Sequence, residues 1–196
     1  LPLSAPLACG SASLSSTSAW PPKWRCTASA PSAAMREGSS AAESSRVSSN
    51  SDCARRSRQL ASALNTLGVA MGERVATLAW NGYRHMELYY GVSGSGAVLH
   101  TINPRLHPEQ IAYIVNHAND EYLFFDLTFL PAIEAMARHC KTVKGYIALC
   151  GREQMPRESG IPTLLCYEEL IESGAPDYVW PQFDERSAAA LCYTSG

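Results

Sequence analysis

Residues 187–196 read Ser187-Ala188-Ala189-Ala190-Leu191-Cys192-Tyr193-Thr194-Ser195-Gly196. The apolar part of this stretch is typical of a buried strand, and the hydroxyl groups and glycine after it are typical of a loop. Backbone amides, hydroxyl groups and a glycine at the end of a strand can together surround phosphate oxygens. We therefore interpret Thr194, Ser195 and Gly196 as part of a phosphate-binding loop, on the strength of the chain that leads into them, because most such triplets taken alone are ordinary turns.

Predicted strands and helices alternate upstream of this loop. Apolar runs bounded by turn residues predict strands at 74–79, 97–102, 122–125, 143–149 and 163–166. Helical spacing with flanking proline or glycine predicts helices that end before Gly68, begin near Tyr83, begin at Pro108, and span 130–137 and 167–172. This alternation predicts parallel βαβ units, and hence an α/β sheet with helices on its faces. Ligands bind such sheets at the carboxyl ends of the strands, where the predicted loop lies.

Composition excludes several classes of protein. A net charge of -2 and 46% hydrophobic residues suit a soluble globular protein, and they offer no electrostatic basis for binding nucleic acid or an anionic membrane. No apolar run approaches the roughly 18 residues that a membrane-spanning helix needs. The seven cysteines are an odd number without a Cys-x-x-Cys pair, which favours reduced thiols and a cytoplasmic location. The five histidines lack the spacing of a zinc site, so we predict no metal-binding residue.

Several segments together resemble one known family. The residues Tyr193-Thr194-Ser195-Gly196 resemble the opening of the phosphate-binding loop of the adenylate-forming (AMP-binding) acyl-CoA synthetases, in which Thr-Thr-Gly, a variable residue and Pro-Lys-Gly would follow. The upstream segments that resemble the family are residues 74–81, 89–92, 96–106, 108–114 and 116–118. The resemblance runs from about Ala54 to Gly196 and is strongest to the fatty-acyl and 3-(methylthio)propionyl-CoA ligases. It implies the parallel-sheet portion of the large N-terminal domain of an adenylate-forming enzyme.

The resemblance implies a two-step ligation of a carboxylic acid to coenzyme A. ATP and the acid would give an acyl-adenylate and pyrophosphate, and the thiol of coenzyme A would then take the acyl group. Thr194, Ser195 and Gly196 would bind phosphate oxygens. The loop's lysine, the acid that binds Mg²⁺ and the catalytic lysine of the C-terminal domain would follow Gly196, so no catalytic residue is assigned within the chain. We therefore expect a fragment that is inactive by itself, with ATP, Mg²⁺ and coenzyme A as the implied cofactors.

Two other functions remain open. One is a noncatalytic, truncated relic of such an enzyme, and the other is an adenylation domain that loads a carrier protein. The fatty-acyl-like segment at 96–118 disfavours the carrier-protein alternative. The expected partner is a small-molecule carboxylic acid, and the sequence indicates no oligomeric state.

Residues 1–52 differ in kind from the rest of the chain. Ser and Ala dominate them, Ile, Phe and Tyr are absent, and no helical or strand period can be traced. We therefore predict a disordered, low-complexity segment in front of a partial AMP-binding domain at 53–196. Three interpretations of the segment stay open: a natural linker, a transit peptide, or sequence read out of frame in a GC-rich gene, since the family's usual N-terminal sequence is not matched there.

Other polar and aromatic residues invite a functional interpretation, but we predict structural roles for them. His100 and Asn103 are expected to satisfy the backbone of a turn, and Tyr89 is expected to pack in the core. Asp126 is expected to cap the helix that follows it. The acidic residues of the short helix at 167–172, Glu168 among them, are expected to be solvated.

Overall fold

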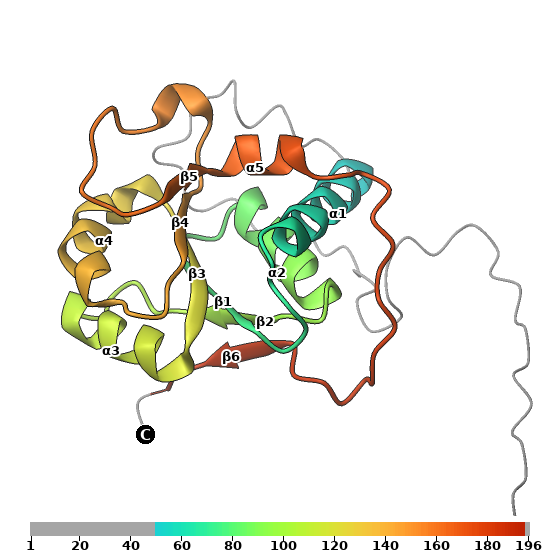
Figure 1. Ribbon diagram of the computed structural model, residues 1–196, viewed down its shortest axis with the longest axis horizontal. Coiled ribbons are helices and arrows are strands. Elements are labelled where there is room, and N and C mark those ends of the chain that lie inside the picture. Colours follow the sequence, from blue (N-terminus) through green and yellow to red (C-terminus); the bar gives the residue numbers. More distant parts are fainter. Residues whose placement is uncertain (1–49, 195–196) are drawn as a thin grey trace, which may run out of the picture.

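Six short strands form one sheet, and all of its neighbouring strands run parallel (Figure 1). The computed structural model describes residues 50–194. The strands lie in the order β5-β4-β3-β1-β2-β6. Their bounds are β1 Arg74–Leu78, β2 Val98–Thr101, β3 Asp120–Phe125, β4 Gly145–Ala148, β5 Leu164–Cys166 and β6 Ala190–Cys192. The predicted α/β fold with a parallel sheet is therefore confirmed.

The helices of the described residues lie between these strands or precede them. The α-helices are α1 Asn50–Thr66, α2 Tyr83–Gly94, α3 Pro108–Ala118, α4 Leu130–Met136 and α5 Tyr167–Ser173, and the 3₁₀-helices are η2 Leu127–Phe129, η3 Ala137–His139 and η4 Arg152–Gln154. Each α-helix predicted from the sequence is present. Helix α1 begins slightly upstream of the boundary expected at Cys53. Residues 50–52 belong to this helix, so the disorder predicted for residues 1–52 is wrong for these three. The rest of that prediction falls on residues 1–49, which lie outside the described residues.

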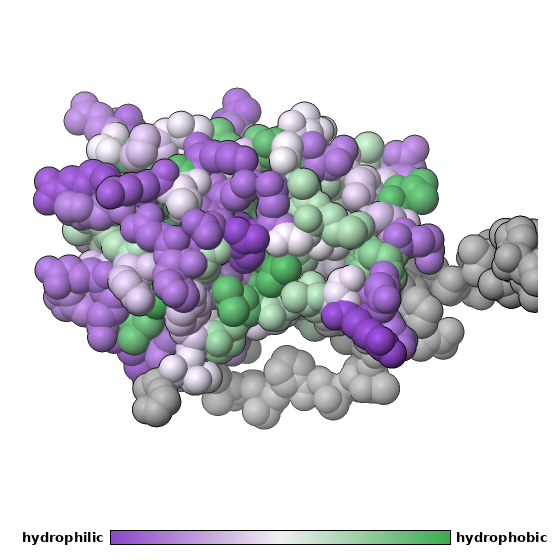
Figure 2. Space-filling view, turned by 60° about the horizontal axis from the view of Figure 1, so that its bottom comes forward, coloured by the Kyte–Doolittle hydropathy of each residue, from purple (hydrophilic) through white to green (hydrophobic). Residues whose placement is uncertain are grey.

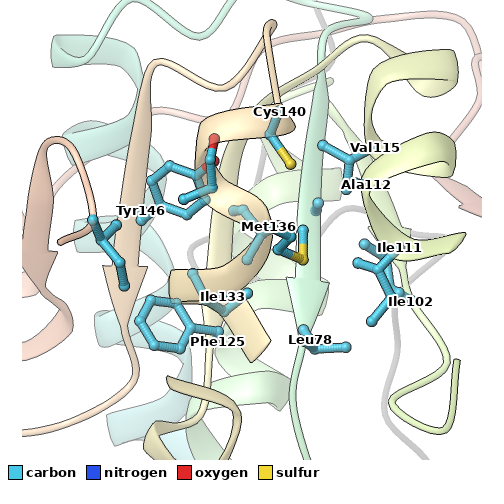
Figure 3. Packing of buried hydrophobic residues seen from close by; sticks show 14 of the residues in the cluster. Leu78, Ile102, Ile111, Ala112, Val115, Phe125, Ile133, Met136, Cys140 and Tyr146 are labelled. Carbon is cyan, nitrogen blue, oxygen red and sulfur yellow. The ribbon is translucent and has the colours of Figure 1, made fainter. Parts of the chain in front are cut away.

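Each face of the sheet has its own apolar core, because successive side chains of a strand point to opposite faces. On one face, α3 and α4 cover a cluster that includes Leu78 and Phe125, as Figure 3 shows. On the other face, α1, α2 and α5 cover a cluster that includes Val75 and Phe124. Burial on both faces explains why the strands of the sequence are nearly continuous apolar runs.

Local sequence explains where α3 begins and ends. Pro108 lies in its first turn, where the missing amide hydrogen costs nothing. The side chain of Gln110 accepts a hydrogen bond from the His107 amide at 3.1 Å. Asn119 ends the helix with a φ of 55°, a left-handed conformation that asparagine adopts more readily than most residues. This helix matters for the candidate site because its last turn lies beside the residue that follows β6.

A buried ionic network joins the three helices on the α1 side of the sheet. Arg56 of α1 donates from Nε to Glu87 of α2 at 2.6 Å and from Nη1 to Glu168 of α5 at 2.9 Å. Arg84 of α2 donates to the same Glu168 at 2.8 Å, and the hydroxyl of Tyr167 donates to Glu87 at 2.8 Å. The side chain of Glu87 is fully buried, and that of Glu168 is 14% exposed. The prediction that Glu168 is solvated is therefore wrong, because arginines from two other helices reach it.

Replacing Glu168 by glutamine is expected to lower the free energy of unfolding by about 2 kcal/mol at neutral pH and by much less in acid. Burial alone would raise the pKa of Glu168, but the hydrogen bonds and charges of Arg56 and Arg84 bring this pKa below its ordinary value. Such a group stabilises the fold above its unfolded pKa, and the contribution is lost as the pH falls through the folded value. Urea unfolding of both proteins over this range measures the effect. A cost that does not change with pH would contradict the ion pairs.

Candidate functional site

The candidate loop begins at Thr194, two residues after the end of β6, which is one of the two edge strands of the described sheet. Strand β6 pairs with β2 in a register that sets Thr101 opposite Cys192. Because the strands are parallel, their carboxyl ends lie at one edge, where ligands of such sheets bind. Thr194 lies exposed at this edge, whereas Ser195 and Gly196 lie outside the described residues. The structure therefore places one of the three predicted site residues.

The strand itself presents little apolar surface for burial. Ala190 and Cys192 are exposed, and only Leu191 between them is half-buried. In Figure 2, which brings forward the side of the molecule that carries β6, apolar residues show between polar ones. The position of the loop must therefore depend on contacts beyond the three residues of the strand.

Tyr193 provides such contacts for the beginning of the loop. Its hydroxyl oxygen lies 2.6 Å from Nδ1 of His117, in the last turn of α3. The centroid of its ring lies 5.2 Å from that of His100 in β2 and 5.8 Å from that of His117. The imidazole of His117 also stacks on Tyr113 of the same helix. The residue before Thr194 is therefore held by side chains from both a strand and a helix.

His100 is in turn fixed by a buried partner. Both His100 and Asp120 are fully buried, and Nδ1 of the first lies 2.7 Å from Oδ2 of the second. Strand β1 lies between β2 and β3, so the pair reaches across it. Burial raises the pKa of Asp120, an effect that the hydrogen bond and charge of His100 partly offset. The prediction that His100 satisfies a turn is wrong, whereas Asn103 does accept a hydrogen bond from the Arg105 amide at 3.0 Å.

More side chains gather at the same edge, after β1 and β3. The carboxylate of Asp126 accepts a hydrogen bond from the Trp80 amide at 2.6 Å, and the Trp80 indole donates to Thr128 at 3.0 Å. The carboxylate of Asp126 therefore joins the ends of two strands instead of capping η2, so the predicted cap is wrong. Burial raises the pKa of Asp126, and the hydrogen bond from the Trp80 amide offsets part of this rise. Tyr89, whose ring lies 5.1 Å from that of His85, is 40% exposed, which corrects the prediction that it packs in the core.

The described residues meet the requirements of neither a metal site nor a membrane-spanning helix. Within residues 50–194, no three His, Cys, Asp or Glu side chains gather as ligands of a metal ion would. None of the helices in that range is both long enough and apolar enough to cross a membrane. A hydroxyl group and backbone amides at the end of a strand are groups that can bind phosphate oxygens, and of the predicted loop Thr194 lies among the described residues.

Sequence reasoning missed the contacts that hold the loop. His117 precedes Tyr193 by 76 positions, and His100 precedes its partner Asp120 by 20. No helical or strand spacing relates residues so far apart. The sequence did hold a signal: an aromatic residue, Tyr193, directly before the loop, and histidines near the ends of a strand and of a helix. These side chains meet because β6 pairs with β2.

Comparison with known proteins gives the family. The pattern of the family described as AMP-binding enzyme matches residues 32–196, and so begins upstream of the start expected at Ala54. Over 145 residues the chain is 50% identical to 3-methylmercaptopropionyl-CoA ligase of Ruegeria lacuscaerulensis. The aligned region covers 74% of this chain and 27% of that protein. Over 141 residues it is 48% identical to medium-chain-fatty-acid–CoA ligase of Ectopseudomonas oleovorans, with 72% and 26% covered. The chain thus spans about a quarter of the length of these relatives.

A solved structure confirms the fold. The anthranilate CoA ligase AuaEII, determined in complex with anthranoyl-AMP, matches with a TM-score of 0.67 over 74% of this chain and 27% of that one, at 24% sequence identity. The matched part is the six-stranded sheet and its helices, as expected for a portion of an N-terminal domain. With the family pattern covering most of its residues, the chain belongs to the AMP-binding enzyme family.

Proposed function

We propose that this chain is part of the N-terminal domain of an ATP-dependent acyl-CoA ligase, and that Thr194, Ser195 and Gly196 begin the loop that holds the phosphates of ATP. The observation that carries the proposal is the 50% identity to a ligase that forms an acyl-CoA. The location of Thr194 at the carboxyl edge of the sheet supports the phosphate-binding role.

The proposed reaction has two steps. A carboxylate oxygen of the acid attacks the α-phosphorus of ATP, the bond from this phosphorus to pyrophosphate breaks, and an acyl-adenylate forms. The thiolate of coenzyme A then attacks the acyl carbonyl carbon, and AMP leaves. Negative charge develops on phosphate oxygens in the first step, so a donor such as the hydroxyl of Thr194 stabilises its transition state. Mg²⁺ would enter with ATP, and no residue of the described chain is assigned to it.

The acid is proposed to be aliphatic. The two relatives with 50% and 48% identity are named for 3-methylmercaptopropionyl-CoA and for medium-chain fatty acids, both of which are aliphatic. We further propose that the 196 residues alone do not catalyse the reaction. They span 27% of the first relative, and the lysine that completes the family's loop is not among the residues up to Gly196.

The test compares the 196-residue chain with a chain extended through the codons that follow Gly196. The extended protein is expected to form acyl-CoA from hexanoate or 3-methylmercaptopropionate, in a reaction that needs ATP and coenzyme A, and to act poorly on benzoate. The 196-residue chain is expected to release no pyrophosphate with any acid. Chromatography measures acyl-CoA, and a coupled assay measures pyrophosphate. Pyrophosphate from the shorter chain would disprove its inactivity, and a folded extended protein that acts on no aliphatic acid would overturn the proposed function.

A further inference from the structure

We propose that Tyr193 is a positioning residue, which with His117 and His100 fixes the start of the phosphate-binding loop and thereby strengthens the binding of ATP. The inference rests on the proposed function of that loop. Its evidence is the set of contacts that join Tyr193 to two different elements of the fold.

The first step of the argument is that β6 alone holds the loop weakly. The strand has three residues, pairs with a single neighbour among the described strands, and exposes two of its three side chains. A short edge strand of this kind contributes little burial and frays readily. The next residue along the chain, Tyr193, is half-buried and packs against the core on the α3 and α4 side of the sheet. Tyr193 is therefore the point at which the loop is joined to the core.

The second step is that the partners of Tyr193 are themselves fixed. His100 is fully buried in β2, and its Nδ1 lies 2.7 Å from the carboxylate of Asp120, which is also fully buried. His117 stacks on Tyr113 within α3, with ring centroids 5.7 Å apart and planes inclined by 21°. A continuous set of contacts therefore runs from β3 through His100, and from α3 through His117, to the residue directly before Thr194.

The third step is the consequence for binding. A loop that is ordered only when its ligand binds loses conformational freedom at that moment, which weakens the observed affinity. A loop whose preceding residue is already fixed loses less conformational freedom when its ligand binds. Removing the hydroxyl of Tyr193 should therefore raise the KM for ATP about fivefold, and removing its ring should raise it about tenfold or more, while kcat changes less.

The first test uses the 196-residue chain and needs no activity. Tyr193→Phe removes only the hydroxyl group, and Tyr178→Phe makes the same change away from the loop. In nitrogen NMR spectra, Tyr193→Phe is expected to shift the Nδ1 resonance of His117 but not those of His139, to increase the mobility of the Thr194 amide, and to speed hydrogen exchange in β6. Unchanged His117 resonances together with an unchanged Thr194 amide would overturn the proposal.

The second test uses the extended protein described above. Tyr193→Phe and His117→Leu should each raise the KM for ATP about fivefold, and the double variant should be no worse than either single one, because both remove the same hydrogen bond. His117→Gln provides an amide that can either donate a hydrogen bond to the Tyr193 hydroxyl or accept one from it, and it should restore much of the affinity. An unchanged KM in an active enzyme would overturn the positioning role even if the NMR contacts are present. An inactive wild-type protein would instead remove the proposed function and the ATP part of this inference, while the NMR test still decides whether Tyr193 holds the loop.

Discussion

Replacing Glu87 by glutamine is expected to destabilise the fold by about 3–5 kcal/mol, because it leaves the buried guanidinium of Arg56 without one of its two carboxylate partners. Glu87 is fully buried, accepts from Nε of Arg56 at 2.6 Å and from Nη2 at 3.1 Å, and also accepts from the hydroxyl of Tyr167. Burial raises the pKa of Glu87, although the hydrogen bonds and charge of Arg56 oppose this effect. An amide keeps the shape of the carboxylate but not its charge.

The matched control for this prediction is Glu169→Gln. Glu169 pairs with Arg152 at the surface, where the two side chains are 42% and 79% exposed, so its loss should cost less than about 1 kcal/mol. Urea unfolding, followed by circular dichroism, gives the free energy of unfolding for wild type and both variants. Equal costs for the two substitutions would show that the buried network contributes no more than a surface ion pair. If the Glu87→Gln chain does not fold at all, the result agrees with the predicted destabilisation but gives no magnitude. The milder Tyr167→Phe, which removes one hydrogen bond to Glu87, should then lower the free energy of unfolding by about 1 kcal/mol.

The strands and helices were predictable because their signals are local. A short apolar run between turn residues is sufficient to indicate a buried strand, as at Tyr122 to Phe125, and Pro108 marks the first turn of α3 whatever its tertiary surroundings. The parallel sheet follows from the alternation of these elements, since parallel strands need a crossover connection. Thr194 was placed correctly at the carboxyl edge for the same reason.

The polar partners were not predictable, because they are set by which elements pack together. Glu168 looked like an ordinary surface acid since nothing near it in the sequence reveals Arg56, which precedes it by 112 positions. Asp126 looked like a helix cap because it directly precedes η2, yet its carboxylate accepts a hydrogen bond from the amide of Trp80, just after the neighbouring strand β1. The propensity of a residue depends on its neighbours in the sequence, whereas Glu168 and Asp126 find their partners on another helix and after another strand.

Gly174→Ala is expected to destabilise the fold by about 3 kcal/mol or more, because there is no room for a methyl group between α5 and α1. A Cβ atom on Gly174 would lie 1.9 Å from the backbone oxygen of Gln59. The backbone conformation of Gly174, with φ -87° and ψ 144°, is open to any residue, so the whole effect should come from this collision. The side chain of Gln59 also donates to the carbonyls of Ile171 and Gly174, at 3.2 and 3.3 Å, so the helix end cannot move without breaking these bonds.

Gly160→Ala is the control for that substitution, since a Cβ atom there would meet nothing within 4 Å, and its cost should stay within about 0.5 kcal/mol. Displacement of α5 by Gly174→Ala would also separate Glu168 from Arg56, because the two side chains come from the helices that must move apart. Combining Gly174→Ala with Glu168→Gln should therefore cost less than the sum of the two single substitutions. Full additivity in urea unfolding would mean that the helix relaxes without moving the ion pair, and the close approach at Gly174 would then have no part in holding the network together.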